Sequence, residues 1–156
     1  MLVLLVTGCG FHLRGAYQLP EAMVKTYVQA NNQNSELIRA LKRNLKANNI
    51  ALVENSIEAT AILTISSETQ NKRILSVDSR GRAREYELNY AVSFNLQDKA
   101  SNFIVDQQTL KLEREFLFDT EDILGKGREE ATLIKDMQQD MVRLILLRLQ
   151  SAVNKN

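Results

Sequence analysis

The sequence contains one cysteine, Cys9, and one histidine, His12, among its 156 residues. A single cysteine cannot form an internal disulfide bond, so its thiol is lipidated, free, or bridged to another chain. One histidine and one cysteine are too few for a credible zinc site, and the sequence has neither a Cys-x-x-Cys pair nor a glycine-rich phosphate loop. No serine or carboxylate stands as an evident catalytic partner of His12. We therefore expect no catalytic residues, no metal and no cofactor beyond a covalently attached lipid.

Charge of one sign and long apolar runs are also lacking. The 20 basic and 19 acidic residues leave a formal net charge of +1, so affinity for phosphate must come from local clusters. No segment approaches the roughly 18 to 20 apolar residues of a transmembrane helix. With 44% hydrophobic and 25% charged residues, the composition is that of one globular domain. These features exclude a membrane-spanning helix but permit a lipid anchor.

The only cysteine lies in the most distinctive stretch of the chain. The apolar run Leu2 to Val6 precedes it, and Val6-Thr7-Gly8-Cys9 matches a lipobox, the motif at which a signal peptide is cut and the cysteine lipidated. We expect residues 1–8 to be the remnant of a lipoprotein signal peptide, and Cys9 to carry a diacylglycerol and an N-acyl chain. The remnant has no basic residue and only five consecutive apolar residues. Either its start is trimmed or misplaced, or the lipobox interpretation is wrong.

Hydrophobic periodicity predicts a strand, a helix and a short strand in the first part of the chain. Val24 to Gln29 alternates as a strand, after the extended segment that carries the only proline. Ser35 can cap a helix in which Leu37 and Leu41 recur at helical spacing. Ile50 to Val53 then begins a short strand.

A long meander follows. Ala61 to Thr69 is predicted to be a strand that runs past the core, and residues 85–96 alternate strictly between apolar and polar, which predicts one buried and one wet face. Ser76 to Gly81 forms the turn between these strands. The next strand region, 103–118, changes its apolar parity, which predicts a bulge near Asp106-Gln107.

A second helix is predicted from about Arg128 to about Val153. Its buried stripe contains Ile134, Met137, Met141, Leu144, Ile145 and Ala152. Further leucines, Leu146, Leu147 and Leu149, widen the apolar surface beyond what one sheet face needs and hint at a partner contact. The order of elements predicts an α+β two-layer sandwich, with an antiparallel or mixed sheet of about four strands and two helices packed on one face.

Basic residues cluster around the predicted turn of the meander. Lys72 and Arg73 precede it, and Arg80, Arg82 and Arg84 follow, with Asp78 as the acidic residue inside the turn. Folded as a hairpin, the five cations are expected to converge into an anion site, because guanidinium groups suit phosphate. Lys126, at the start of the second helix, would join this site if the fold brings it near. The alternative is a solvated hairpin tip that discourages edge aggregation.

A second basic surface is the outer face of the first helix. It contains Arg39, Lys42, Arg43 and Lys46. This face could bind phosphate too, but a solvated face of an amphipathic helix is the commoner meaning of such a pattern.

The heptapeptide Cys9-Gly10-Phe11-His12-Leu13-Arg14-Gly15, read with the order of elements as far as about Val153, resembles the start of the mature LPS-assembly lipoproteins of the LptE family. The resemblance implies a lipid-anchored protein on the periplasmic face of the outer membrane of a Gram-negative cell. It implies a plug that helps to assemble the LptD β-barrel and supports lipopolysaccharide transport. It also divides the chain into a lipidated cysteine and tether, 9–22, and one α+β domain, 23–154.

Other functions remain as alternatives. An anchored lipoprotein could bind another anionic lipid or a nucleic acid through the same hairpin, without a barrel partner. Nucleic acid is not expected, because aromatic stacking residues are absent among the cations and a lipobox implies the wrong compartment. A lipoprotein enzyme lacks an evident site.

Overall fold

The structure, a computed structural model, describes residues 17–117 and 123–153, with the side chains of residues 123–126 excepted. The elements in chain order are η1 (Glu21–Val24), β1 (Lys25–Ala30), α1 (Glu36–Ala47), β2 (Ala51–Leu52), β3 (Ala61–Val77), β4 (Ala83–Asp98), β5 (Phe103–Leu117) and α2 (Ile123–Val153).

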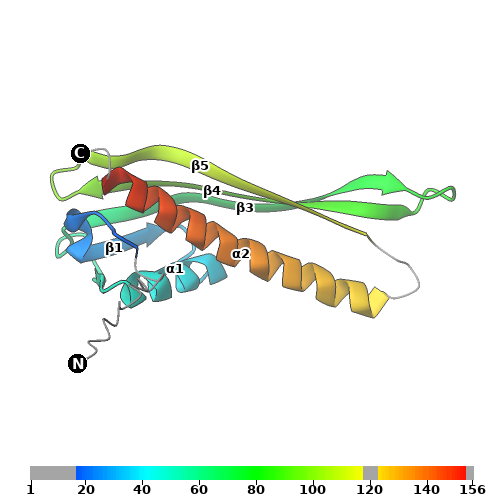
Figure 1. Ribbon diagram of the computed structural model, residues 1–156, viewed down its shortest axis with the longest axis horizontal. Coiled ribbons are helices and arrows are strands. Elements are labelled where there is room, and N and C mark those ends of the chain that lie inside the picture. Colours follow the sequence, from blue (N-terminus) through cyan, green and yellow to red (C-terminus); the bar gives the residue numbers. More distant parts are fainter. Residues whose placement is uncertain (1–16, 118–122, 154–156) are drawn as a thin grey trace, which may run out of the picture.

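The strands form one mixed sheet in the order β2-β1-β3-β4-β5. β1 pairs in parallel with β2 and β3, whereas β3, β4 and β5 form an antiparallel meander. The α+β class is confirmed, and the fifth strand is the two-residue β2. Because β1 pairs with β3 only as far as Ile65, the rest of the meander extends well beyond the compact end of the molecule (Figure 1). We call this extension the wing: residues 67–77, 83–93 and 109–117.

The helix α1 forms where the sequence predicts it. The Ser35 hydroxyl accepts a hydrogen bond from the backbone N–H of Ile38 at 3.2 Å and so caps the first turn. The helix ends near Asn49, whose positive φ of 62° is a conformation that asparagine tolerates. Its apolar face is fully buried through Leu37, Ile38, Leu41 and Leu45.

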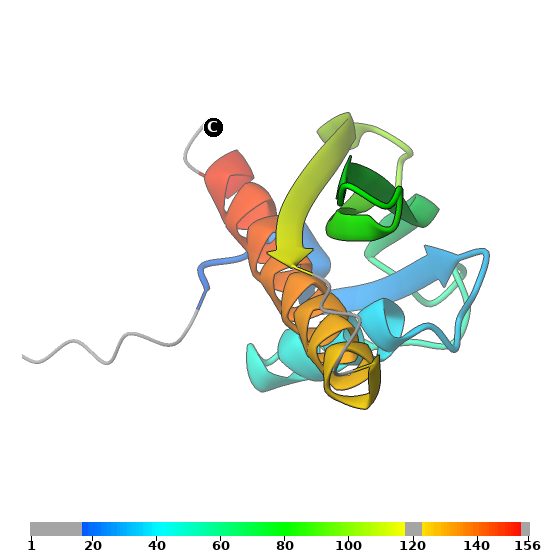
Figure 2. The same ribbon diagram turned by 90° about the vertical axis from the view of Figure 1, so that its right-hand side faces the viewer.

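The helix α2 begins at Ile123, about one turn before the expected start. Its second half is buried more extensively than a single stripe, because it packs against α1 as well as the sheet (Figure 2). Val142, which the sequence analysis missed, is buried, whereas Leu144 is only partly so. The hint of a partner contact was wrong for Leu146 and Leu149, since both belong to the core. Of the three leucines, Leu147 alone is exposed, by 44%.

The bulge predicted near Asp106-Gln107 is confirmed. Phe94 pairs with Gln108 and Leu96 with Val105, so the β5 segment between these pairs has one residue more than the β4 segment. The extra residue restores the apolar side chains of β5 to the helix-facing side of the sheet.

The two hairpin loops share one architecture. In each, an aspartate N–H donates to the carbonyl four residues later, at 2.8 Å for Asp78 and 3.0 Å for Asp98. The fourth loop residue has positive φ: 76° at Gly81 and 65° at Ser101. Each aspartate side chain also accepts backbone N–H groups of its own loop. The turn of the wing therefore spans 78–82, slightly later than predicted, because β3 continues to Val77.

Candidate anion-binding site at the tip of the wing

Five cations were expected to converge near the turn, and the structure brings only some of them together. Lys72 and Arg73 are consecutive residues of a strand, so their side chains lie on opposite faces of the sheet. Lys72 Nζ forms an ion pair with Glu130 of α2 at 2.7 Å and lies 4.9 Å from the ring centre of Tyr86. It therefore fastens the wing to the helix, away from the tip.

Arg73 also forms an ion pair within the wing, with Glu87. On the face away from the helices, its Nε and Nη2 donate to the two carboxylate oxygens of Glu87 at 2.6 and 3.0 Å. These hydrogen bonds hold the pKa of Glu87 below its ordinary value. The bidentate pair leaves Arg73 little capacity for a second anion.

The tip itself contains Arg80, Arg82 and Arg84. Arg82 pairs with Asp78 at 2.7 Å, and hydrogen bonds from Arg82, the backbone N–H first among them, lower the pKa of Asp78. Asp78 is thus a part of the turn, and Arg82 helps to hold it.

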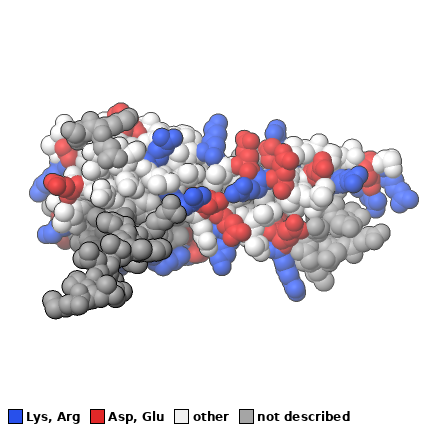
Figure 3. All heavy atoms as spheres, viewed as in Figure 1, with Lys and Arg blue, Asp and Glu red and all other residues white. Residues whose placement is uncertain are grey.

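Arg80 and Arg84 differ from the other three cations. Both are exposed, and neither forms an ion pair with any residue of the described part of the chain. Near Arg84 the pairing passes from Ser76 with Glu85 to Val77 with Ala83, so Arg84 is an extra residue in β4. Bulges of this kind redirect a side chain away from the regular sheet. Lys and Arg side chains gather at this end of the molecule, whereas both signs mix along the middle (Figure 3).

Two predicted site residues lie outside what the structure describes. Cys9 precedes the described residues, and the side chain of Lys126 is not described. The start of α2 is fastened at Lys72 by Glu130 rather than at the turn. The segment 126–128 lies in the first turns of this helix.

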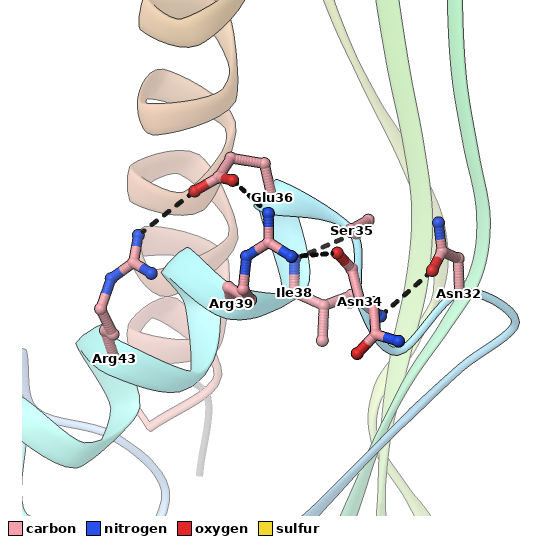
Figure 4. A network of polar contacts seen from close by, with 7 residues as sticks. All are labelled: Asn32, Asn34, Ser35, Glu36, Ile38, Arg39 and Arg43. Carbon is pink, nitrogen blue, oxygen red and sulfur yellow. Dashed lines mark hydrogen bonds and ion pairs between the residues drawn. The ribbon is translucent and has the colours of Figure 1, made fainter.

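The basic face of α1 forms contacts of its own (Figure 4). Arg39 donates to the Glu36 carboxylate, which Arg43 approaches at 3.8 Å, and Lys42 Nζ donates to Gln33 at 3.0 Å. The Arg39 hydrogen bond is the main cause of a lowered pKa at Glu36. This face matches a solvated amphipathic helix with local ion pairs, so the tip is the stronger candidate site.

An apolar feature of the wing escaped the sequence analysis. Around the two bulges, four large side chains are between 40 and 57% exposed: Ile74, Leu75, Val77 and Leu117. Their signal in the sequence was the run Ile74-Leu75-Ser76-Val77, which breaks the alternation expected of a strand.

Neither a metal centre nor a membrane-spanning helix is found in the described ranges. Within 17–117 and 127–153 no three histidine, cysteine or acidic side chains form a group that could hold a metal ion. The helices of the same part of the chain are too short or too polar to cross a bilayer.

Comparison with known proteins gives a family and a fold. A family model described as "LptE: Lipopolysaccharide-assembly" matches residues 23–149. The LPS-assembly lipoprotein LptE of Photorhabdus laumondii is 27% identical over 154 residues, which cover 99% of this chain and 84% of that protein. A solution structure of lipoprotein B from Nitrosomonas europaea superposes with a TM-score of 0.73 at 34% identity, over 88% of each chain.

A more distant structure has the same fold. Rare lipoprotein B from Shewanella oneidensis gives a TM-score of 0.73 at 24% identity, over 84% of this chain and 97% of that one. The family match covers all the described elements from β1 to most of α2. This chain belongs to the LptE family, whose members are non-enzymatic lipoproteins of lipopolysaccharide assembly.

Proposed function

We propose that this chain is the outer-membrane lipoprotein that plugs the LptD β-barrel, and that the tip of its wing binds lipopolysaccharide. The barrel partner and the periplasmic face of the outer membrane come from the family resemblance carried by residues 9–15. Acyl chains on Cys9 would hold the domain at the membrane, because several acyl chains anchor a protein more stably than one chain does.

The observation that carries lipopolysaccharide binding is the pair of exposed guanidinium groups, Arg80 and Arg84, which form no ion pair with residues 17–117 or 127–153. Both sit at the end of a three-stranded ladder, and Glu130 ties that ladder to α2 through Lys72. A phosphate at the tip would therefore meet donors whose backbone is already ordered. Phosphate and guanidinium match in planar geometry as well as in charge. Lys126 remains a further predicted member of this site.

The test is direct binding of purified lipopolysaccharide to the domain. Arg80→Asp with Arg84→Asp should weaken binding by at least about tenfold, since each charge-assisted hydrogen bond contributes roughly 1.5 to 3 kcal/mol. The matched control is Arg43→Asp with Lys46→Asp, which reverses two exposed charges on α1. Equal loss in both variants, or no loss in the tip variant with an unchanged circular dichroism spectrum, would refute the tip assignment.

Arg82 provides a second comparison. Its ion pair with Asp78 belongs to the turn, so Arg82→Gln should reduce binding less than the double change at the tip. A larger loss for Arg82→Gln alone would mean that the site is centred on the turn.

A further inference from the structure

Four exposed apolar side chains surround the wing immediately before its basic tip, and we call them the apolar collar: Ile74, Leu75, Val77 and Leu117. Their exposed fractions are 56, 40, 57 and 56%. Exposed apolar residues that are scattered singly need no explanation, but four of them at one level of the wing, beside a charged end, mark a contact surface.

The collar exists because of two successive irregularities in the β3–β4 ladder. Ile74 pairs with Tyr86 and Ser76 with Glu85, which makes Leu75 an extra residue of β3. The next step makes Arg84 an extra residue of β4. As a result, apolar and cationic side chains at the same level of the wing no longer follow the strand pattern in which successive side chains alternate between the two faces.

Apolar residues lie on both faces of the sheet at this level. Ile74 pairs with Tyr86, which stacks on Phe116 on the helix-facing side with a ring separation of 5.6 Å. Leu117 follows Phe116 in β5 and pairs with Glu85, so it lies on the opposite face. A flat protein surface would cover only one of these faces.

We propose that the apolar collar contacts the acyl chains of the lipopolysaccharide molecule whose phosphates Arg80 and Arg84 bind. The inference rests on the proposed binding at the tip and adds a second, apolar subsite to it. Charge complementarity selects this occupant: an anionic amphiphile presents phosphate and hydrocarbon in adjacent layers. The tip and the collar present guanidinium and apolar side chains in the same succession.

The absence of tryptophan from the chain permits a direct test. Val77→Trp and Leu117→Trp each place one fluorophore in the collar, on either side of the ladder. Ile57→Trp, at a residue that is 84% exposed in the β2–β3 connection, is the matched control. Each variant is titrated with intact lipopolysaccharide and with de-O-acylated lipopolysaccharide, which keeps the phosphates but loses its ester-linked chains.

Intact lipopolysaccharide should shift the emission of both collar variants to shorter wavelength and leave Ile57→Trp unchanged. The de-O-acylated form should bind with a smaller shift, because it keeps only its amide-linked chains. No shift with intact lipopolysaccharide, a shift in only one collar variant, or equal shifts with both forms would overturn the collar assignment. A shift produced by the purified barrel without lipid would assign the collar to a protein contact instead.

A second measurement covers tryptophan variants that fail to fold. Val77→Ser with Leu117→Ser should weaken binding of intact lipopolysaccharide by about tenfold, because half-exposed apolar side chains lose burial. Binding of the de-O-acylated form, which keeps only its amide-linked chains, should weaken less. Equal affinity for intact lipopolysaccharide would reject the collar, whereas failure of the Arg80 and Arg84 test would reject the tip itself.

Discussion

Arg73 and Glu87 face each other across the β3–β4 ladder and share two hydrogen bonds, at 2.6 and 3.0 Å. The Glu87 side chain is only 6% exposed, and it also accepts from Asn89 Nδ2 at 2.5 Å. A residue chosen from the sequence as an anion ligand is thus an internal partner on the polar face of the wing. The candidate anion site is therefore limited to the tip, and Arg73 and Glu87 form a charged cross-strand pair within the wing.

The Arg73–Glu87 pair predicts a pH dependence of stability. Hydrogen bonds from Arg73 lower the pKa of Glu87 below its ordinary value of 4.5. The unfolded chain then binds more protons than the folded one between the two pKa values, so the free energy of unfolding rises with pH there. The contribution is complete above about pH 4.5 and is lost as pH falls through the folded-state value. Glu87→Gln should flatten this slope in urea denaturation across pH 2–6.

The control for that slope is Glu54→Gln, at an exposed carboxylate with no ion pair in the described part of the chain. Its denaturation curves should keep the wild-type slope. If Glu87→Gln keeps that slope as well, the pair does not contribute to acid stability.

The two hairpin loops predict opposite effects of glycine and serine. Ser101 has a φ of 65°, which costs an L-residue roughly 1 to 2 kcal/mol, while Gly81 occupies the equivalent position at 76°. Ser101→Gly should raise the free energy of unfolding by about 0.5 to 1 kcal/mol after the entropy cost of glycine, and Gly81→Ser should lower it. Thermal unfolding of the two single variants measures both signs. A loss of stability in Ser101→Gly would show that its side chain is needed in the loop.

Adjacent leucines of α2 predict a large difference in core packing. Leu146 is 1% exposed and Leu147 is 44% exposed. Leu146→Ala should cost about 2 to 5 kcal/mol because it leaves a cavity between α2 and the rest of the core. Leu147→Ala should change stability by roughly 0.5 kcal/mol. Similar losses at the two positions, measured by chemical denaturation, would contradict the orientation of α2.

Much of the fold could be predicted because local patterns dominate it. The Ser35 cap, the period of α1, the alternation of β4 and the parity change at Asp106-Gln107 each depend on residues close in sequence. The burial of Leu149 could not be predicted in this way. Leu149 belongs to a core to which α1 also contributes, from about a hundred residues away in the sequence.

The candidate site was predictable only in outline. Successive side chains of a strand point to opposite faces of the sheet, so the separation of Lys72 from Arg73 could have been predicted from the sequence. The ion-pair partner of Lys72 could not have been predicted, since Glu130 is 58 residues away in the sequence. The bulges at Leu75 and Arg84 depend on how β3 and β4 register, which the turn at 78–82 and the pairing beyond it decide together. The register of β3 and β4 therefore places the bulges at Leu75 and Arg84, beside which the collar and the tip lie.

We propose that this chain acts in lipopolysaccharide assembly inside a β-barrel partner. The most direct measurement expresses the full lipidated chain in a Gram-negative cell, extracts the membranes gently and identifies what copurifies. We expect LptD to copurify in near one-to-one amount, and less lipopolysaccharide to copurify when Arg80 and Arg84 are both changed to aspartate. A chain that carries its acyl groups but emerges without the barrel would contradict the account and indicate a free lipoprotein for another anionic ligand.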